Sequence, residues 1–228
     1  MADFAVWIRT HYSRLDLAFQ LKDTAFSFLS NDVSVLNTGA TDPLYSEKFI
    51  MALDAHVRCA SAPYILLLED DIAFSADAQG VIRLALQAEL PHVWFTLPNV
   101  EALTSSVPLW GPFRRIHIVN NFYYSGAVLL RTKSLRDFLL EYLLDHTQLD
   151  VPNFDVNLSR FLLRDAPGGL FLAPGYFGSD PSVPSSISFD AGNAHPSRTL
   201  ERSTLDPLFS YEKSVHTHPR KVVASACV

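Results

Sequence analysis

Cysteine is scarce in this chain of 228 residues, which contains only Cys59 and Cys227. Two isolated cysteines make neither a disulfide framework nor the paired spacing of a zinc site. Basic residues are outnumbered, with 18 Lys and Arg against 24 Asp and Glu, and the formal net charge of -6 argues against a general nucleic-acid-binding protein. Long apolar runs are missing as well, because none approaches the ~20 residues of a membrane-spanning helix.

The N-terminus also lacks the basic start and apolar stretch of a secretory signal, and Asp3 comes early. These features predict a cytoplasmic protein without a transmembrane segment. Association with a membrane through a partner or a lipid-linked substrate stays an open alternative. Hydrophobic residues make up 48% of the chain and charged residues 18%, so a substantial core is expected. The length fits one α/β domain.

Apolar patterns of strand and helix type alternate along the first three quarters of the chain. Strands are expected at 4–8, 33–36, 63–68, 93–97, 113–119, 127–130 and 170–173, helices at 15–29, 49–60, 81–90, 135–143 and 154–162, and a loop at 98–112. Such alternation predicts a Rossmann-like α/β fold, with a mainly parallel sheet flanked by helices on both faces. From residue 174 onward Pro, Ser, Gly and Asp dominate. We therefore expect a catalytic domain at 1–175 and, at 176–228, a C-terminal extension that packs over the active site.

Residues 63–72 stand out, because five strand-forming residues run straight into Glu69, Asp70 and Asp71. A continuous apolar run bounded by a proline and a charge cluster predicts a strand buried on both faces. Carboxylates at its end would lie in the crevice where open α/β sheets bind ligands. Three adjacent acids repel one another and suit a hard divalent cation, which prefers oxygen ligands. The alternative is an acidic surface loop that follows a core strand.

The sequence Leu68-Glu69-Asp70-Asp71-Ile72 resembles the DxD-type motif of metal-dependent glycosyltransferases of the GT-A fold. It is similar to the LEDD/FEDD form of the lipooligosaccharide-type glycosyltransferases and of the N-acetylglucosaminyltransferase IV family. The resemblance covers about the first 175 residues in the order of elements and motifs. It implies a Mn²⁺ or Mg²⁺ cofactor, a nucleotide-sugar donor, with a UDP-sugar favoured, and a saccharide or lipid-linked acceptor, as in polysaccharide biosynthesis.

By this resemblance, Asp71 is the direct metal ligand, while Glu69 and Asp70 shape the metal shell or contact the ribose. The turn after the first strand is similar to the nucleotide-binding turn of many GT-A enzymes, which places Thr10 and Arg14 near the base or ribose. The alternative is that Thr10 ends a strand and Arg14 is a solvated helix residue.

Two further segments fit a sugar and metal site. Tyr124-Ser125-Gly126-Ala127 resembles the aromatic-Gly-Ala segment that borders donor and acceptor sugars, so Tyr124 and Gly126 are predicted to bind the donor. An ordinary strand turn with core tyrosines is the alternative. A C-terminal histidine often supplies another metal ligand in such enzymes, and we take His218 as the candidate, with His216 and His195 in reserve. The alternative there is a solvated basic tail.

Asp155 is the predicted catalytic base, because the base of inverting GT-A enzymes often occupies a comparable helix start; Asp150 is the reserve. An Asp in a first helical turn also stabilises the helix dipole whatever the function. If the enzyme retains anomeric configuration, Asp155 would instead orient the acceptor.

Other activities of α/β proteins fit less well. A nucleotidyltransferase would be expected to carry a Gly-rich, basic phosphate loop near the N-terminus, which this chain lacks. An aspartyl-type phosphatase would place its acids after the first strand, where Arg9-Thr10-His11 stands. A non-catalytic module that binds a sugar or nucleotide remains an alternative.

Overall fold

A computed structural model describes residues 3–10, 14–37, 45–96, 105–116, 126–144, 154–165 and 169–180. The helices in these ranges are α1 (Leu15–Phe28), α2 (Tyr45–Cys59), α3 (Ala78–Gln87), α5 (Thr132–Leu144) and α6 (Phe154–Asp165). The strands are β1 (Phe4–Thr10), β2 (Val33–Asn37), β3 (Tyr64–Glu69), β4 (Ile72–Phe74), β5 (His92–Trp94), β6 (Val107–Pro108), β7 (Arg114–Ile116), β8 (Ala127–Arg131), β9 (Leu170–Leu172) and β10 (Phe177–Ser179).

Eight of these strands form one sheet, in the order β2-β1-β3-β8-β5-β9-β7-β6. The pairs β1–β2, β1–β3 and β5–β9 are parallel, whereas β8 is antiparallel to both β3 and β5. At the far edge β7 is antiparallel to β9 and to β6. The sheet is therefore mixed and not mainly parallel. The prediction of an α/β fold with a sheet between helices is confirmed. A strand buried on both faces has the same continuous apolar pattern in either direction, so the reversal of β8 left no mark in the sequence.

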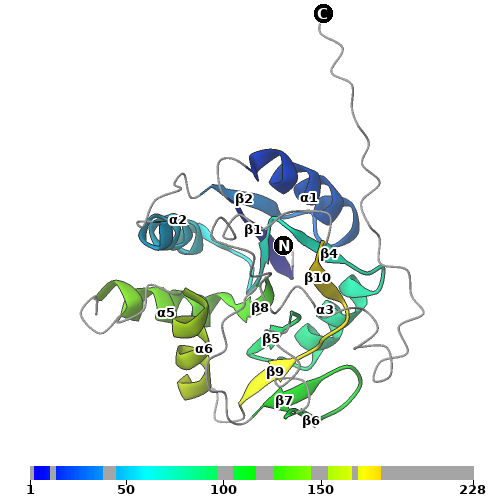
Figure 1. Ribbon diagram of the computed structural model, residues 1–228. Helices are drawn as coiled ribbons and strands as arrows, with labels where there is room; N and C mark the ends of the chain where they lie inside the picture. Colours follow the sequence, from blue (N-terminus) through cyan, green and yellow to red (C-terminus); the bar gives the residue numbers. More distant parts are fainter. Residues whose placement is uncertain are drawn as a thin grey trace, which may run out of the picture.

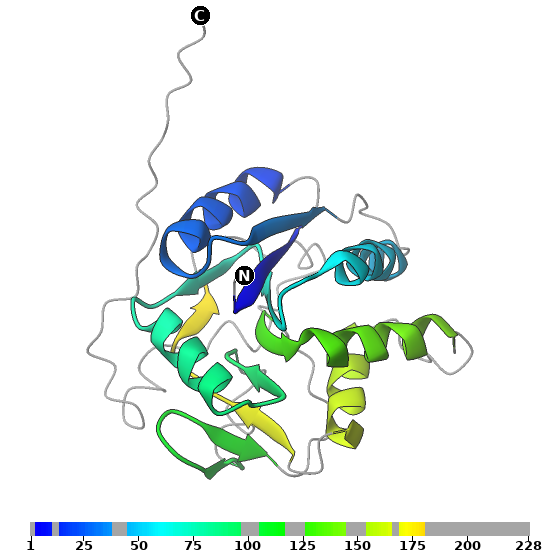
Figure 2. The same ribbon diagram turned by 180° about the vertical axis from the view of Figure 1, so that it is seen from behind.

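Helices cover both faces of this sheet, as Figure 1 and the view from behind in Figure 2 show. One core cluster joins the sheet to α1 and α3, and the other joins it to α2, α5 and α6. The central strand β3 contributes to both, because Leu66 and Leu68 pack on the α1 and α3 side and Ile65 and Leu67 on the opposite side. All four side chains are buried, which confirms the predicted double burial.

A second, two-stranded sheet follows the acids. Strand β4 pairs antiparallel with β10, so that Phe74 lies opposite Phe177 and Ile72 opposite Ser179. Phe177 is buried and its ring lies 4.8 Å from that of Phe95, centroid to centroid. Residues 177–179 thus join the core next to the acidic residues, although they belong to the predicted C-terminal extension. The boundary at residue 175 stays a prediction, and residues 181–228 lie outside the described ones.

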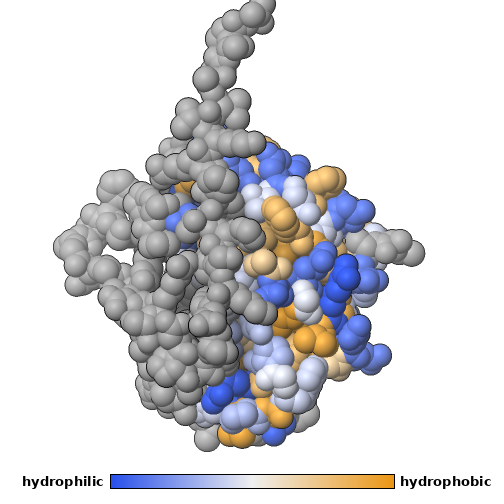
Figure 3. All heavy atoms as spheres, turned by 90° about the vertical axis from the view of Figure 1, so that its right-hand side faces the viewer, coloured by the Kyte–Doolittle hydropathy of each residue, from blue (hydrophilic) through white to orange (hydrophobic). Residues whose placement is uncertain are grey.

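Large apolar side chains are also exposed on the α1 and α3 side of the molecule. Phe19, Phe26 and Phe28 of α1 and Leu84 of α3 are each at least 41% exposed. Figure 3 shows that hydrophobic residues on this face alternate with hydrophilic ones. No helix in the described ranges has the length and apolar character needed to span a membrane.

The predicted loop at 98–112 contains β6, the edge strand next to β7.

Candidate functional site

The candidate site lies at the carboxyl ends of β1 and β3. The chain leaves β1 toward β2 through α1, then returns past β1 to β3 through α2, which packs on the opposite face. The strand order therefore reverses between β1 and β3, the kind of position where open α/β sheets form a ligand-binding crevice. Glu69 ends β3 here, and Asp70 and Asp71 follow directly. We call these three residues the acidic motif.

Glu69 forms an ion pair with Arg9. The two residues are direct neighbours in the register of β1 and β3, so their side chains leave the sheet on the same face. The backbone N–H of Glu69 donates to the carbonyl of Gly126 at 2.8 Å, which brings the predicted donor-binding glycine beside the acidic motif. The Arg9 guanidinium also lies 5.8 Å from the ring centroid of Phe154. Sequence reasoning missed Arg9, because only strand register brings it to Glu69.

Asp70 is 7% exposed and is held by two residues of the β1–α1 junction. The Thr10 hydroxyl donates to Asp70 Oδ2 at 2.6 Å, and Arg14 lies 3.0 Å from Asp70 Oδ1. Burial raises the pKa of Asp70 above its usual value, and neighbouring Asp71 adds to this, although Thr10, Arg14 and Arg9 act in the opposite direction. At neutral pH the ionised Asp70 carboxylate therefore lowers the unfolding free energy. This loss is removed as the pH falls from the raised pKa toward the usual value of the carboxyl group.

Asp71 is 3% exposed, and its Oδ2 lies 3.5 Å from the same guanidinium of Arg14. Its carbonyl accepts a 2.6 Å hydrogen bond from the N–H of Asp180, the residue after β10. Arg14 thus bridges the two aspartates. The predicted need for positive charge is met in part by the protein itself, since Arg9 pairs with Glu69 and Arg14 lies beside both Asp70 and Asp71.

The donor set fits a divalent cation that is shared with a substrate. Within the described ranges no group of three or more His, Cys, Asp or Glu side chains is placed to hold a metal ion. Mg²⁺ and similar ions are commonly bound by one or two carboxylates, with substrate phosphates and water completing the shell. The oxygen atoms of Asp70 and Asp71, with the carboxylate of Glu69 next to them in the sequence, match that chemistry. They do not match an all-protein metal cage.

The other predicted site residues are placed in part. Asp155 is the second residue of α6, which confirms its position in a first helical turn. It follows Phe154, the residue whose ring contacts Arg9, so the start of α6 lies near the acidic motif. The side chain of Asp155 lies outside the described part of the structure. Tyr124 and His218 lie outside the described residues, as do Asp150, His195 and His216.

Comparisons with known proteins leave the function open. No protein-family model matches the sequence, and no curated protein matches it. Among the solved structures that match is the crystal structure of A197 from STIV, with a TM-score of 0.42 and 13% sequence identity over 74% of this chain and 80% of that chain. A likeness at this level supports no argument about activity, so the α/β assignment rests on the strand order and helix placement described above.

Proposed function

We propose that the protein is a metal-dependent glycosyltransferase of the GT-A type. It would move a sugar from a nucleotide-sugar donor, with a UDP-sugar favoured, to a saccharide or lipid-linked acceptor in the cytoplasm. The observation that supports the proposal is the position of the acidic motif. It follows a doubly buried strand at the reversal point of the sheet, and Thr10 and Arg14 from the β1–α1 junction hold its aspartates.

In this proposal the acidic motif receives the donor diphosphate. Asp71, with Asp70 beside it, would hold a Mn²⁺ or Mg²⁺ ion, and such an ion neutralises charge on a leaving diphosphate. Arg14 lies 3.0 and 3.5 Å from the two aspartates and adds a fixed cation where that charge develops. Thr10 keeps Asp70 oriented through its hydroxyl hydrogen bond. Gly126 sits beside Glu69 without a side chain, which leaves room for the donor sugar.

Asp155 would act as the base if the reaction inverts the anomeric centre. It would accept the proton of the attacking acceptor hydroxyl, a step that needs a carboxylate within hydrogen-bond reach of that hydroxyl. The placement of the α6 N-terminus next to Arg9 supports this role. In a retaining enzyme the same residue would orient the acceptor.

Isothermal calorimetry with UDP-, GDP- and CMP-linked sugars tests the donor site. With Mn²⁺ present, we expect one donor class to bind the wild type, and EDTA to abolish binding. Asp71→Asn should weaken donor binding by about tenfold or more, since even changes to groups around a metal ligand cost that much. Asp54→Asn is the matched control, because Asp54 pairs with Arg58 on α2 and lies outside the acidic motif. Folded wild type that binds no donor would remove the proposal.

A turnover assay with a panel of acceptors tests catalysis separately. Asp155→Asn should lose most sugar transfer while it keeps donor affinity, because the residue is assigned to proton transfer and not to the diphosphate. Metal-dependent donor binding without transfer in the wild type would identify a non-catalytic binding module instead. Release of diphosphate from a nucleoside triphosphate and a sugar phosphate would identify a nucleotidyltransferase.

A further inference from the structure

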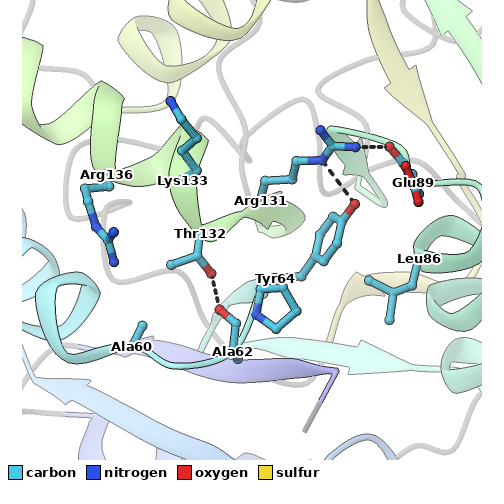
Figure 4. Close-up of a pocket in the computed structure, with 10 residues that line it drawn as sticks. Ala60, Ala62, Tyr64, Leu86, Glu89, Arg131, Thr132, Lys133 and Arg136 are labelled. Carbon is cyan, nitrogen blue, oxygen red and sulfur yellow. Dashed lines mark hydrogen bonds between the residues drawn. The ribbon is translucent and has the colours of Figure 1, made fainter. Parts of the chain in front are cut away.

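A cavity of about 610 Å³ lies at the amino end of β3, between the end of α3 and the junction of β8 and α5. Figure 4 shows that its two arginines point in different directions. Arg131 donates to the hydroxyl of Tyr64 at 3.1 Å and to the backbone carbonyl of Glu89 at 2.5 Å. Arg136 donates to the carbonyl of Val57 at 3.1 Å. Because these charges diverge, the described lining of the cavity does not converge on a single anion.

The hairpin of β6 and β7 has a different character, because it exposes apolar side chains. Figures 1 and 2 show this hairpin at the opposite edge of the sheet from β2. Residues 107–111, with the sequence Val-Pro-Leu-Trp-Gly, are exposed without interruption and carry no charge. Val107 is 51% exposed, Leu109 36% and Trp110 45%. We call residues 107–111 the apolar tip. Exposed apolar runs of this length disfavour solubility and indicate a function.

The apolar tip is held in one conformation by the turn that it forms. The Leu109 N–H donates to the Phe113 carbonyl at 3.0 Å, and the Phe113 N–H donates to the Trp110 carbonyl at 3.1 Å. Gly111 lies inside this turn at a φ of 54°, which glycine adopts without strain. Phe113 is buried, and its ring lies 4.7 Å from that of Trp110, centroid to centroid. These contacts fix the exposed part of Trp110 in one orientation.

Two arginines follow the turn. Arg114 and Arg115 begin β7, and both are partly exposed. Arg114 donates to the hydroxyl of Ser106 at 2.6 Å and to its carbonyl at 2.9 Å, which braces the base of the hairpin. Residues 105–116 contain no acidic residue, although the whole chain has a formal net charge of -6. Since a strand advances about 3.3 Å per residue, the two arginines lie within roughly 7 Å of the turn.

The shape and chemistry of the apolar tip fit a lipid surface better than a protein or a sugar. A stable protein interface uses roughly 20–30 residues on each side, many more than the tip offers. A saccharide that stacks on Trp110 would need hydrogen-bonding side chains beside it, and the other residues of the tip have none. Membrane-surface segments combine apolar and aromatic side chains, buried about 5–10 Å deep, with basic residues near the headgroups. The hairpin has the same order of side chains.

We propose that the β6–β7 hairpin docks the protein on an anionic phospholipid membrane. Val107, Leu109 and Trp110 enter the interface, and Arg115, which lies opposite Val107, contacts the lipid phosphates. The rest of the chain carries the net negative charge, so repulsion from the lipid favours docking with the hairpin toward the membrane. Three apolar side chains give weak and reversible binding. Four strands separate β6 from β3, so this surface is distinct from the acidic motif and does not depend on the proposed glycosyl transfer.

Tryptophan fluorescence of the full chain tests the docking directly. The chain has three tryptophans, and Trp7 and Trp94 are buried, so Trp110 reports on the hairpin. Vesicles of equal parts phosphatidylcholine and phosphatidylglycerol should shift the emission to shorter wavelength and reduce its quenching by acrylamide. Trp110→Phe should lose this shift while it still co-sediments with the vesicles, because phenylalanine is also apolar. Wild type that shows neither the shift nor co-sedimentation would overturn the proposal.

Co-sedimentation of matched variants tests whether the apolar tip makes the contact. Leu109→Glu should weaken vesicle binding about tenfold or more, because the tip loses a leucine side chain and gains a negative charge. Leu140→Glu is the matched control, since Leu140 is 55% exposed on α5, outside the hairpin. Should Leu109→Glu fail to fold, Val107→Glu decides the question with the same expected loss. Equal weakening in the hairpin variant and in Leu140→Glu would contradict the proposal.

The variant Arg115→Gln tests the preference for anionic lipid. Loss of one arginine near the surface should weaken binding to the mixed vesicles about fivefold. Arg164→Gln should leave this binding unchanged, because Arg164 pairs with Glu141 away from the hairpin. Equal binding of the wild type to mixed vesicles and to phosphatidylcholine alone would contradict the anionic surface. Self-association that Leu109→Glu abolishes, without any vesicle binding, would assign the tip to a contact between copies of the chain instead.

Discussion

Acidic side chains lie at the carboxyl end of β3 and arginines lie near its amino end, and the two sets of charges have different kinds of partner. At the carboxyl end, the acidic motif is nearly enclosed, and its carboxylates are paired with Arg9 and Arg14. At the amino end, Arg131 and Arg136 line an open cavity and bond to neutral groups. A buried ion pair contributes to the unfolding free energy, because removing one partner leaves the other charge buried. A guanidinium group that is bonded only to neutral groups keeps its full positive charge. The contrast predicts that the unfolding free energy depends more on the side chains at the carboxyl end of β3 than on exposed ion pairs elsewhere.

Removal of Arg14 should have the largest effect on stability. In Arg14→Met the buried aspartates lose their shared cation, and breaking a buried pair from one side costs about 3 kcal/mol of unfolding free energy. The exposed pair of Arg164 and Glu141 provides the comparison, because Arg164→Met should cost less than about 1 kcal/mol. Urea unfolding at neutral pH measures both. Equal losses of unfolding free energy in the two variants would show that the buried pairs of Arg14 stabilise the fold no more than the exposed pair does.

Acid should destabilise the protein through His92. This residue is the first of β5, and it pairs with Leu130 of β8. Burial lowers the pKa of His92 from 6.5 to about 3, with a backbone hydrogen bond to Gly169 acting the other way. Between those values the unfolded chain binds a proton that the folded protein does not, so stability falls as the pH drops below 6.5. The slope is about 1.4 kcal/mol per pH unit.

The variant His92→Gln isolates this contribution. Glutamine keeps an acceptor for the Phe171 N–H, which lies 3.4 Å from His92 Nε2, but it does not titrate. The difference in unfolding free energy between wild type and variant should therefore change by about 2.7 kcal/mol over two pH units below 6.5, as followed by urea unfolding. Parallel pH profiles would mean that His92 does not control the acid response.

The smallest expected effect concerns Glu89, whose φ of 51° lies in the left-handed region. It lies two residues after the end of α3, where the Leu90 N–H donates to the Ala85 carbonyl, a place that favours glycine. Glu89→Gly should raise stability by about 0.5–1 kcal/mol.

Glu89→Gln separates backbone strain from charge. It removes the charge but keeps a side chain at a positive φ, so stability should stay near that of the wild type. Chemical denaturation of both variants measures the difference. A stability gain in Glu89→Gln equal to that in Glu89→Gly would rule out backbone strain as the cause.

Local sequence predicted the central strand well. The run from Tyr64 to Leu68 is apolar throughout and is followed at once by charge, a pattern that fits few structures other than a doubly buried strand with acids at its end. Thr10 and Arg14 were expected near the base or ribose of the donor, because the turn after the first strand resembles that of GT-A enzymes. The structure adds that they bind the acidic motif directly.

Contacts that depend on strand pairing could not be predicted from the sequence. Arg9 meets Glu69 across 60 residues of chain, and nothing local marks either residue as the partner of the other. Strands β4 and β10 are three residues each, too short for a periodicity, and they pair across about a hundred residues. The contacts of Arg131 with Tyr64 and Glu89 could not be predicted for the same reason, because these residues are far apart in the sequence and adjacent only in the folded protein.

The position of β8 beside β3 has a consequence for how the chain folds. The acidic motif and its arginines are contained in residues 9–71, so they can assemble with β1 and β2 before the later part of the chain is made. Until β8 arrives, however, β3 is an apolar edge strand with unpaired backbone groups, a template for association with other chains. Pairing with β8 closes that edge and brings Arg131 opposite Tyr64 in one step. The contact between Arg131 and Tyr64 and the protection of β3 from aggregation thus arise in the same folding event.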